Sequence, residues 1–238
     1  DLLGKFTPIT AGFKLDLSEL SKRGLDWDDY IPDDLNKIWL NNFEVIKKLG
    51  QVKFKRAVVP VDAVNLDIET IEMADASQSL ACSSVYVRFK RKSGEFSCQL
   101  IFSRSKIIPK NMTIPRAELF AALLNATTGH VVYTALREYI KTRIHLTDSQ
   151  IVLFWINNTT SQMKQWVRNR VIEINRLTSR ENWFYIETAN MMADLGTRKG
   201  AEIVDISANS SWCNGLDWAK TDKECFPIRS VNDIKLTI

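Results

Sequence analysis

Three short β-type runs follow one another with no helical segment between them, and this order constrains the fold more than any other feature of the sequence. The runs cover residues 68–75, 83–90 and 96–104. A polar stretch from Lys90 to Gly94 separates the second run from the third, which is typical of a hairpin turn. Because connections this short join antiparallel strands, the sequence predicts three consecutive antiparallel strands.

Helical periodicity becomes prominent after these strands. Apolar residues recur at three- and four-residue steps along a long segment and again along a later one. We expect helices at about 115–140, 149–157, 161–178 and 190–198, and strands near 143–147 and 182–187. The resulting order, β-β-β-α-β-α-α-β-α, predicts an α/β domain with a five-stranded mixed sheet flanked by helices.

The first fifty residues are predicted to be helical. A clear helix is expected from about Pro32 to Leu49, with acidic residues in its first turn, lysines in its last and Gly50 as its stop. Its apolar face is formed by Leu35, Ile38, Trp39, Phe43 and Ile46. This face must cover the sheet or pack on a separate domain, and the sequence leaves both possibilities open.

Charge is distributed unevenly along the chain. The net charge is +4, and residues 63–206 hold the whole excess, with 18 basic and 14 acidic side chains. Residues 1–62 and 207–238 are each balanced. A central segment with surplus positive charge is compatible with a polyanionic partner, although a modest basic excess is also common on solvated surfaces.

The cysteines and the apolar stretches exclude several classes of protein. Four cysteines without a C-x-x-C pair, together with two histidines, make a zinc site unexpected and favour free thiols. A pair between Cys213 and Cys225 stays open. The longest apolar stretch, 119–136, is interrupted by polar residues, so we expect a soluble chain.

Four acidic residues stand at the ends of predicted elements: Asp75, Glu118, Asp148 and Asp194. Each has an ordinary explanation by itself; Asp148 could cap a helix and Asp75 could belong to a turn. In this topology, however, the strands that end at Asp75 and Asp148 are neighbours. We therefore expect the four carboxylates to converge on an oxygen-rich pocket suited to hard divalent cations.

Such a pocket predicts a reaction type. Two divalent ions about 4 Å apart can activate a water molecule and stabilise the leaving oxygen during attack on a phosphodiester. No nucleophilic side chain is required, which agrees with the lack of a Ser-His or Cys-His signature in the sequence.

The segments around these acids resemble those of ribonuclease H domains. Ala74-Asp75-Ala76-Ser77 is similar to the first-strand motif, and Thr113-Ile114-Pro115-Arg116-Ala117-Glu118-Leu119 to the segment around the second acid. Leu146-Thr147-Asp148-Ser149 and Ala193-Asp194-Leu195-Gly196-Thr197-Arg198 resemble the remaining two. More narrowly, the likeness is to BEL/Pao-type retrotransposon polyproteins. Further matching segments are 24–32, 103–106, 152–156 and 169–171.

The resemblance implies a ribonuclease H-like fold and an endonuclease that cuts the RNA strand of RNA–DNA hybrids during reverse transcription. It implies that Asp75, Glu118, Asp148 and Asp194 bind two Mg²⁺ ions, for which Mn²⁺ would substitute. It also implies a reverse transcriptase domain in the same polyprotein as a partner. The expected location is the cytoplasm, within virus-like particles for an active element, or the nucleus for a domesticated one.

The resemblance also predicts how the chain is organised. Residues 1–62 would be a helical tether from the reverse transcriptase, residues 63–206 the ribonuclease H domain, and residues 207–238 a tail packed on the core.

Several side chains are candidates for contact with nucleic acid. Ile114 and Pro115 replace asparagines that cellular ribonucleases H place there, so Ser77 is expected to help recognise the RNA sugar. The full set is Ser77, Thr113, Arg116, Ser149, Asn157, Lys164, Arg168 and Arg170. The basic residues around 161–178 are equally compatible with a solvated helix face that has Trp166 in the core.

Two other functions are compatible with the sequence. A retained retroelement fragment would act as a nucleic-acid-binding or protein-interaction module with little cleavage. An integrase-type strand transferase would use three acids and leave Asp194 without a role.

Overall fold

The computed structural model describes residues 1–234 and contains one six-stranded mixed sheet. The strands are β1 (Ile68–Ala76), β2 (Leu80–Lys90), β3 (Phe96–Ile107), β4 (Ile140–Thr147), β5 (Trp183–Ile186) and β6 (Ile228–Arg229). Their order across the sheet is β3-β2-β1-β4-β5-β6. The first three strands pair antiparallel and β4 is a neighbour of β1, both as the sequence predicts. β4 runs parallel to β1.

The sheet has one strand more than the predicted five. β6 is a two-residue strand from the tail that pairs antiparallel with β5, through Tyr185–Arg229 and Ile186–Ile228. A strand this short has no periodicity of its own, so only its pairing with β5 defines it. The last four residues of the predicted tail, 235–238, lie outside the described residues.

The helices are α1 (Thr7–Lys22), α2 (Asp33–Leu49), α3 (Ile114–Leu136), α4 (Gln150–Asn157), α5 (Gln165–Leu177) and α6 (Ser211–Asn214). The predicted helix at 161–178 is divided, because a separate 3-10 turn at Thr160–Gln162 precedes α5. The predicted last helix at 190–198 is two 3-10 turns, η3 (Thr188–Asn190) and η4 (Met192–Gly196). Asp194 therefore lies in a short turn and not in an α-helix.

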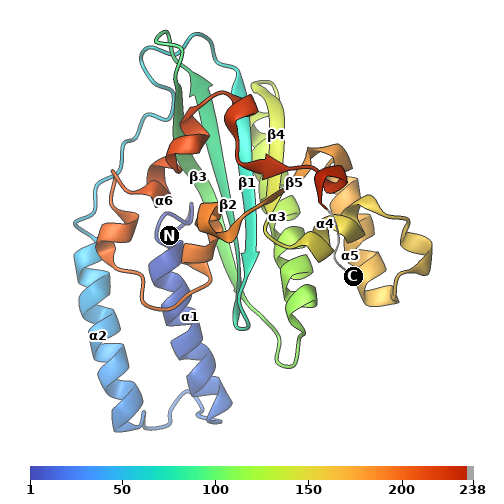
Figure 1. Ribbon diagram of the computed structural model, residues 1–238. Coiled ribbons are helices and arrows are strands. Elements are labelled where there is room, and N and C mark those ends of the chain that lie inside the picture. The colour runs from blue at the N-terminus through green and yellow to red at the C-terminus, as the bar shows by residue number, and fades with distance from the viewer. Residues whose placement is uncertain (235–238) are drawn as a thin grey trace.

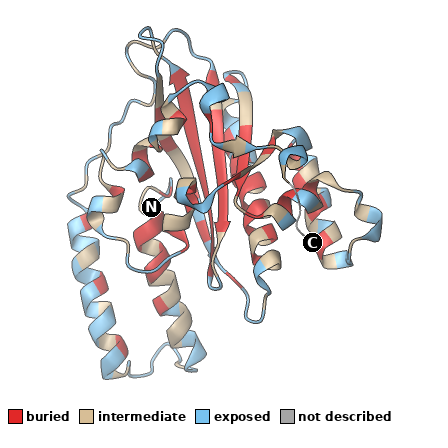
Figure 2. Ribbon diagram, in the orientation of Figure 1, coloured by how far each residue is buried: buried red, intermediate tan, exposed pale blue. Residues whose placement is uncertain are grey.

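The two faces of the sheet are covered by different parts of the chain. α3 packs on β1 and β2 from one face, while α1, η4 and α6 pack against the other (Figure 1). Strands β1 and β2 are buried along almost their whole length, whereas α2 is largely exposed (Figure 2). α3 is long and apolar enough to cross a membrane, but half of that apolar window is buried against this core.

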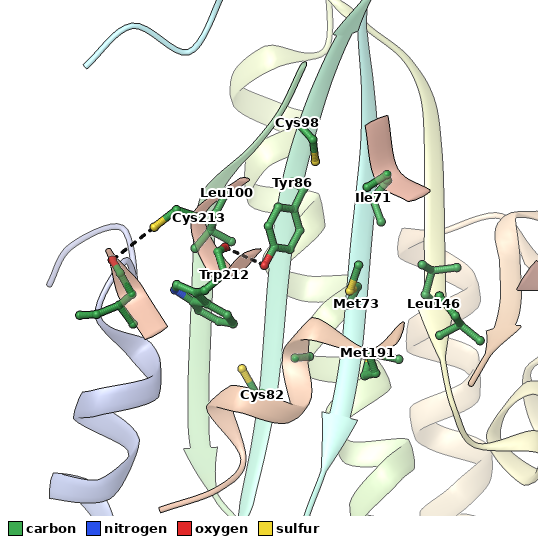
Figure 3. Close-up of a cluster of buried hydrophobic side chains, with 14 of the residues drawn as sticks. Ile71, Met73, Cys82, Tyr86, Cys98, Leu100, Leu146, Met191, Trp212 and Cys213 are labelled. Atoms are coloured by element: carbon green, nitrogen blue, oxygen red, sulfur yellow. Dashed lines mark hydrogen bonds between the residues drawn. The ribbon is translucent and has the colours of Figure 1, made fainter. Parts of the chain in front are cut away.

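The N-terminal and C-terminal segments contribute to the main core. Ile9 of α1 and Trp212 and Phe226 of the tail share a cluster with Ile71 and Tyr86 of the sheet. Figure 3 shows Trp212 beside Tyr86, whose hydroxyl donates a 2.9 Å hydrogen bond to the Trp212 carbonyl oxygen. All four cysteines are free; Cys82, Cys98 and Cys213 are buried and Cys225 is exposed.

The apolar face predicted for residues 32–49 is only partly covered by the rest of the chain. Leu35 is buried, but Ile38, Phe43 and Ile46 are exposed. α2 packs mainly on α1, and Val45 and Leu49 near its C-terminal end join the main core.

Candidate active site

Four carboxylates lie at the edge of the sheet where β1 and β4 end. Asp75 is the next-to-last residue of β1 and pairs with Cys82 of β2, and Asp148 follows directly after β4. Glu118 lies in the second turn of α3, and Asp194 lies in η4, which packs against β1 and β2. The structure therefore brings together elements that are separated by up to 119 positions in the sequence, from Asp75 to Asp194.

Each carboxylate is held by a neighbouring hydrogen-bond donor. Thr197 Oγ1 donates to Asp75 at 2.6 Å, and Ser149 Oγ donates to Glu118 at 2.6 Å. Thr188 Oγ1 donates to Asp148 at 2.7 Å. The guanidinium of Arg198 contacts Asp194 at 2.7–2.8 Å. The sequence motifs contain Ser149, Thr197 and Arg198, but nothing in them indicated these pairings, and Thr188 was not foreseen.

The carboxylates also influence one another electrostatically. Burial, against the lowering effect of the Thr197 hydrogen bond and with the added repulsion of Asp148 and Asp194, raises the pKa of Asp75 to about 6. Burial likewise raises the pKa of Glu118, with a contribution from Asp148. The pKa of Asp148 is raised by burial and by Asp194. Asp148 thus lies within electrostatic range of the other three, which identifies it as the centre of the cluster.

This electrostatic arrangement fits a divalent cation. The donor set consists of oxygen ligands alone, as Mg²⁺ prefers. A bound cation would stabilise the ionised carboxylates against the burial and repulsion that raise these pKa values. Within residues 1–234, no group of three or more His, Cys, Asp and Glu side chains is arranged closely enough to hold a metal ion. Each carboxylate accepts hydrogen bonds from the threonine, serine or arginine partner described above, and a carboxylate can keep such a bond while it binds an ion.

Residues 1–149 match the family model described as Pao retrotransposon-like RNaseH-like domain. The chain belongs to this family. The match covers more than half of the sequence and includes Asp75, Glu118 and Asp148. Asp194 lies beyond the matched residues. No curated protein matches the chain.

Two solved ribonuclease H structures are similar to this RNase H-like domain. One is the N-terminal RNase H domain of a Mycobacterium tuberculosis protein, solved as a fusion with maltose-binding protein. It is 12% identical, with a TM-score of 0.36 over 54% of this chain and 89% of that one. The other is RNase H1 from the halophilic archaeon Halobacterium salinarum, 14% identical, with a TM-score of 0.30 over 52% of this chain and 87% of that one.

A separate groove, which none of the four carboxylates lines, collects part of the predicted nucleic-acid set. A cavity of about 700 Å³ lies between the start of α3, the end of α4 and the start of α5. Thr113, Arg116 and Lys164 line it, together with Asn158 and Trp155. Within residues 1–234, Arg116, Lys164, Arg168 and Arg170 form no ion pair with a carboxylate.

Trp166 is half-buried at the side of this groove and lies close to two arginines. The Arg170 guanidinium is 3.5 Å from the centre of the Trp166 ring, and that of Arg116 is 5.4 Å from it. Burial and the charge of Arg116 lower the pKa of Arg170. Two guanidinium groups close together without an acidic partner favour binding of an anion.

The remaining candidates occupy other positions. Ser149 is buried, caps α4 through the Val152 amide and contacts Glu118, so it supports the carboxylates. Ser77 accepts hydrogen bonds from the backbone of the β1–β2 turn. Asn157 donates to the Leu153 carbonyl of its own helix. Arg168 lies on α5 outside the groove lining.

Proposed function

We propose that this domain cuts the RNA strand of RNA–DNA hybrids by metal-dependent hydrolysis during reverse transcription of a retrotransposon. The observation that carries the proposal is the cluster centred on Asp148, in which burial and mutual repulsion raise the pKa values of Asp75, Glu118 and Asp148. Such a set of carboxylates has a strong electrostatic reason to bind divalent cations.

Asp75, Glu118, Asp148 and Asp194 would hold two Mg²⁺ ions, and Mn²⁺ would substitute. When bound, the ions would supply the positive charge that activates a water molecule and stabilises the charge that develops on the phosphate. The chain's own contribution is to place the ligands. Thr197 holds Asp75, Ser149 holds Glu118 and Thr188 holds Asp148, each through a hydrogen bond from its hydroxyl group.

The groove lined by Thr113, Arg116 and Lys164 would bind the phosphate backbone of the hybrid. Phosphate contacts provide affinity without base specificity, which suits an enzyme that cuts hybrids of any sequence. Arg168 and Arg170 on α5 would extend this surface.

The reverse transcriptase domain of the same polyprotein would be the partner of the N-terminal helices. The exposed Ile38, Phe43 and Ile46 on α2 support this, because apolar side chains in a row are typical of a face that packs on another domain. Replacing them with polar residues would then weaken the packing of this domain on the reverse transcriptase domain but would not change hybrid cleavage by this domain alone.

The decisive experiment is cleavage of a labelled RNA–DNA hybrid with Mg²⁺ or Mn²⁺, comparing the wild type with Asp75→Asn. Single-stranded RNA and duplex DNA are the substrate controls. Hybrid-specific cleavage that the variant loses supports the proposal. A folded wild-type protein that binds the hybrid but cuts it with neither metal would instead indicate a binding module, and cleavage of duplex DNA would indicate a strand-transferase type of enzyme.

A further inference from the structure

A buried polar network connects three of the elements that carry the carboxylates. Asn125 of α3 donates from Nδ2 to the Met73 carbonyl oxygen of β1 at 2.9 Å and lies 3.2 Å from Ser83 Oγ of β2. Asn125 Oδ1 lies 3.1 Å from His145 Nδ1 of β4. The same Nδ1 is 3.3 Å from the carboxylate of Glu72 on β1. Asn125 and His145 are 0% exposed and Glu72 is 1% exposed.

The hydrogen bonds determine which ring nitrogen of His145 carries the hydrogen. Because the Asn125 amide nitrogen donates to Met73 and Ser83, its amide oxygen must accept, and His145 Nδ1 must therefore carry the hydrogen. Burial lowers the pKa of His145 to about 4, so its ring is neutral at physiological pH. The ring stacks on Trp183 at a centroid distance of 4.8 Å, which fixes its plane.

Glu72 is held by a second set of contacts. Arg143 donates to both of its oxygens, at 2.8 and 3.0 Å, and Thr70 donates to one of them at 2.9 Å. Burial opposes ionisation of Glu72, yet the Arg143 guanidinium holds its pKa below the usual range. Gly129 of α3 makes room for the pair, since a Cβ at that position would lie 1.6 Å from Glu72 Oε2.

The network lies about 10 Å from the carboxylates along each of the three elements. Glu72 and His145 are register partners, and each stands three residues before a carboxylate of its strand, Asp75 and Asp148. Asn125 stands seven residues after Glu118 on the same face of α3. Three strand residues and seven helix residues span similar lengths, so the two sets have the same offset along all three elements. Side chains alternate along a strand, so Glu72 points to the face covered by α3 and Asp75 to the face covered by η4.

Net stability does not explain such a network. Removing charged groups from water costs about as much as their pairing returns, and an apolar core of similar volume is often at least as stable. What the network provides is a fixed register between α3, β1 and β4, because each hydrogen bond is satisfied in only one relative position of these elements.

We infer that Asn125, His145 and Glu72 form a positioning layer that holds Glu118, Asp148 and Asp75 at the separation needed to share divalent cations. The inference rests on the proposed function and assigns a role to residues that do not themselves contact the ions. Loss of the layer would leave each carboxylate in place on its own element but would change the distances between them.

The test measures metal affinity directly in the full chain. Mn²⁺ binding to wild type and Asn125→Ala is followed by electron paramagnetic resonance, alongside the half-saturating Mg²⁺ concentration for hybrid cleavage and the hybrid Kd in EDTA. We expect Asn125→Ala to weaken Mn²⁺ binding about tenfold, the lower end of the effect of groups that orient metal ligands. The hybrid Kd should stay within about twofold.

Asn42→Ala is the matched control. Asn42 is also buried and donates a 2.9 Å hydrogen bond to Asp16, but it lies on α2, outside the three elements that Asn125 joins. Its only described link toward the site is the ion pair between Asp16 and Lys199. This variant should lose a similar amount of stability and keep its Mn²⁺ affinity. Equal Mn²⁺ affinities of the two variants would overturn the inference.

Two substitutions of His145 provide a second, independent comparison should Asn125→Ala not fold. His145→Gln retains an N–H donor for Asn125, whereas His145→Leu does not, so the glutamine should preserve Mn²⁺ affinity better than the leucine. Equal losses contradict a positioning role. A wild type that neither binds Mn²⁺ nor cleaves the hybrid overturns the proposed function and this inference together, while a normal wild type beside an unaffected Asn125→Ala overturns this inference alone.

Discussion

Thr197 Oγ1 lies 2.6 Å from Asp75 Oδ2 and 2.9 Å from the carbonyl oxygen of Asp194. Thr197 therefore contacts both the turn that carries Asp194 and the end of β1, where Asp75 lies 122 residues earlier in the chain. Through this contact, the turn that carries Asp194 is fastened to the end of β1. The position of the fourth carboxylate thus depends on a hydroxyl group as well as on the fold of the backbone.

Thr197→Val should therefore reduce hybrid cleavage, on the order of tenfold, because it removes one hydrogen bond of about 1–2 kcal/mol to a carboxylate. Thr197→Ser retains the hydroxyl and should cleave at close to the wild-type rate. Single-turnover cleavage rates of the two variants provide the comparison. Equal rates for valine and serine would show that the contact has no part in the reaction.

Asp75→Asn should abolish cleavage and yet stabilise the metal-free protein. The pKa of Asp75 is raised to about 6, so keeping it ionised at pH 7.5 costs folding free energy, up to roughly 3 kcal/mol. A neutral asparagine avoids this cost. Thermal unfolding in EDTA should show a higher Tm for the variant, and added Mg²⁺ should raise the Tm of the wild type alone. A lower Tm for the variant in EDTA would contradict this assignment.

The stability of the metal-free protein should respond to pH through two opposing groups. His145 has a folded pKa of about 4, below its ordinary value, so the unfolded chain takes up a proton first and stability falls from about pH 6.5 to 4. Asp75 is raised to about 6 and takes up its proton first in the folded state, so stability rises as pH falls through this value. Each effect is on the order of 3 kcal/mol.

Between pH 7 and pH 4.5, His145→Gln should lose less free energy of unfolding than the wild type, because it lacks the group whose protonation favours the unfolded chain. Asp75→Asn should lose more than the wild type, because it lacks the group whose protonation favours the folded state. Urea unfolding at the two pH values measures both changes. If the pH dependence of stability changed in the same direction in both variants, the opposite effects assigned to His145 and Asp75 would be wrong.

Lys164→Ala with Arg168→Ala should weaken hybrid binding and flatten its dependence on salt. Each phosphate contact that is lost releases one fewer counterion and lowers the slope of log K against log salt by about 1. Lys37→Ala with Lys48→Ala, on α2, changes the net charge equally and should leave the slope as it is. An unaltered slope in the α5 variant would assign this face to the solvent.

Trp212→Ala should destabilise the protein by about 3–5 kcal/mol, because it empties a fully buried site in the main core. It also removes the hydrogen bond from Trp212 Nε1 to the Lys5 carbonyl oxygen. Trp27 is 98% exposed, and Trp27→Ala should have almost no effect on urea unfolding. Similar losses for both variants would mean that the tail does not hold the core together.

The family and the main architecture were predictable from the sequence. Strand alternation and helix periodicity are local patterns, so the three antiparallel strands, the long helix α3 and the strand ending at Asp148 could all be recognised. The four acids could be named because the segments around them resemble those of ribonuclease H domains, and because Asp75 and Asp148 stand at the ends of strands. The structure shows Asp148 within electrostatic range of the other three, while their roles as metal ligands stay a prediction.

Tertiary packing alone decided the rest. Thr188 and Thr197 reach Asp148 and Asp75 only because η3 and η4 fold back across the ends of the strands. β6 exists only because the tail reaches β5, and the network of Asn125, Glu72 and His145 joins residues that have no common pattern in the sequence. Local periodicity reports which side of an element is buried, whereas the partner of a polar side chain depends on how distant elements pack together.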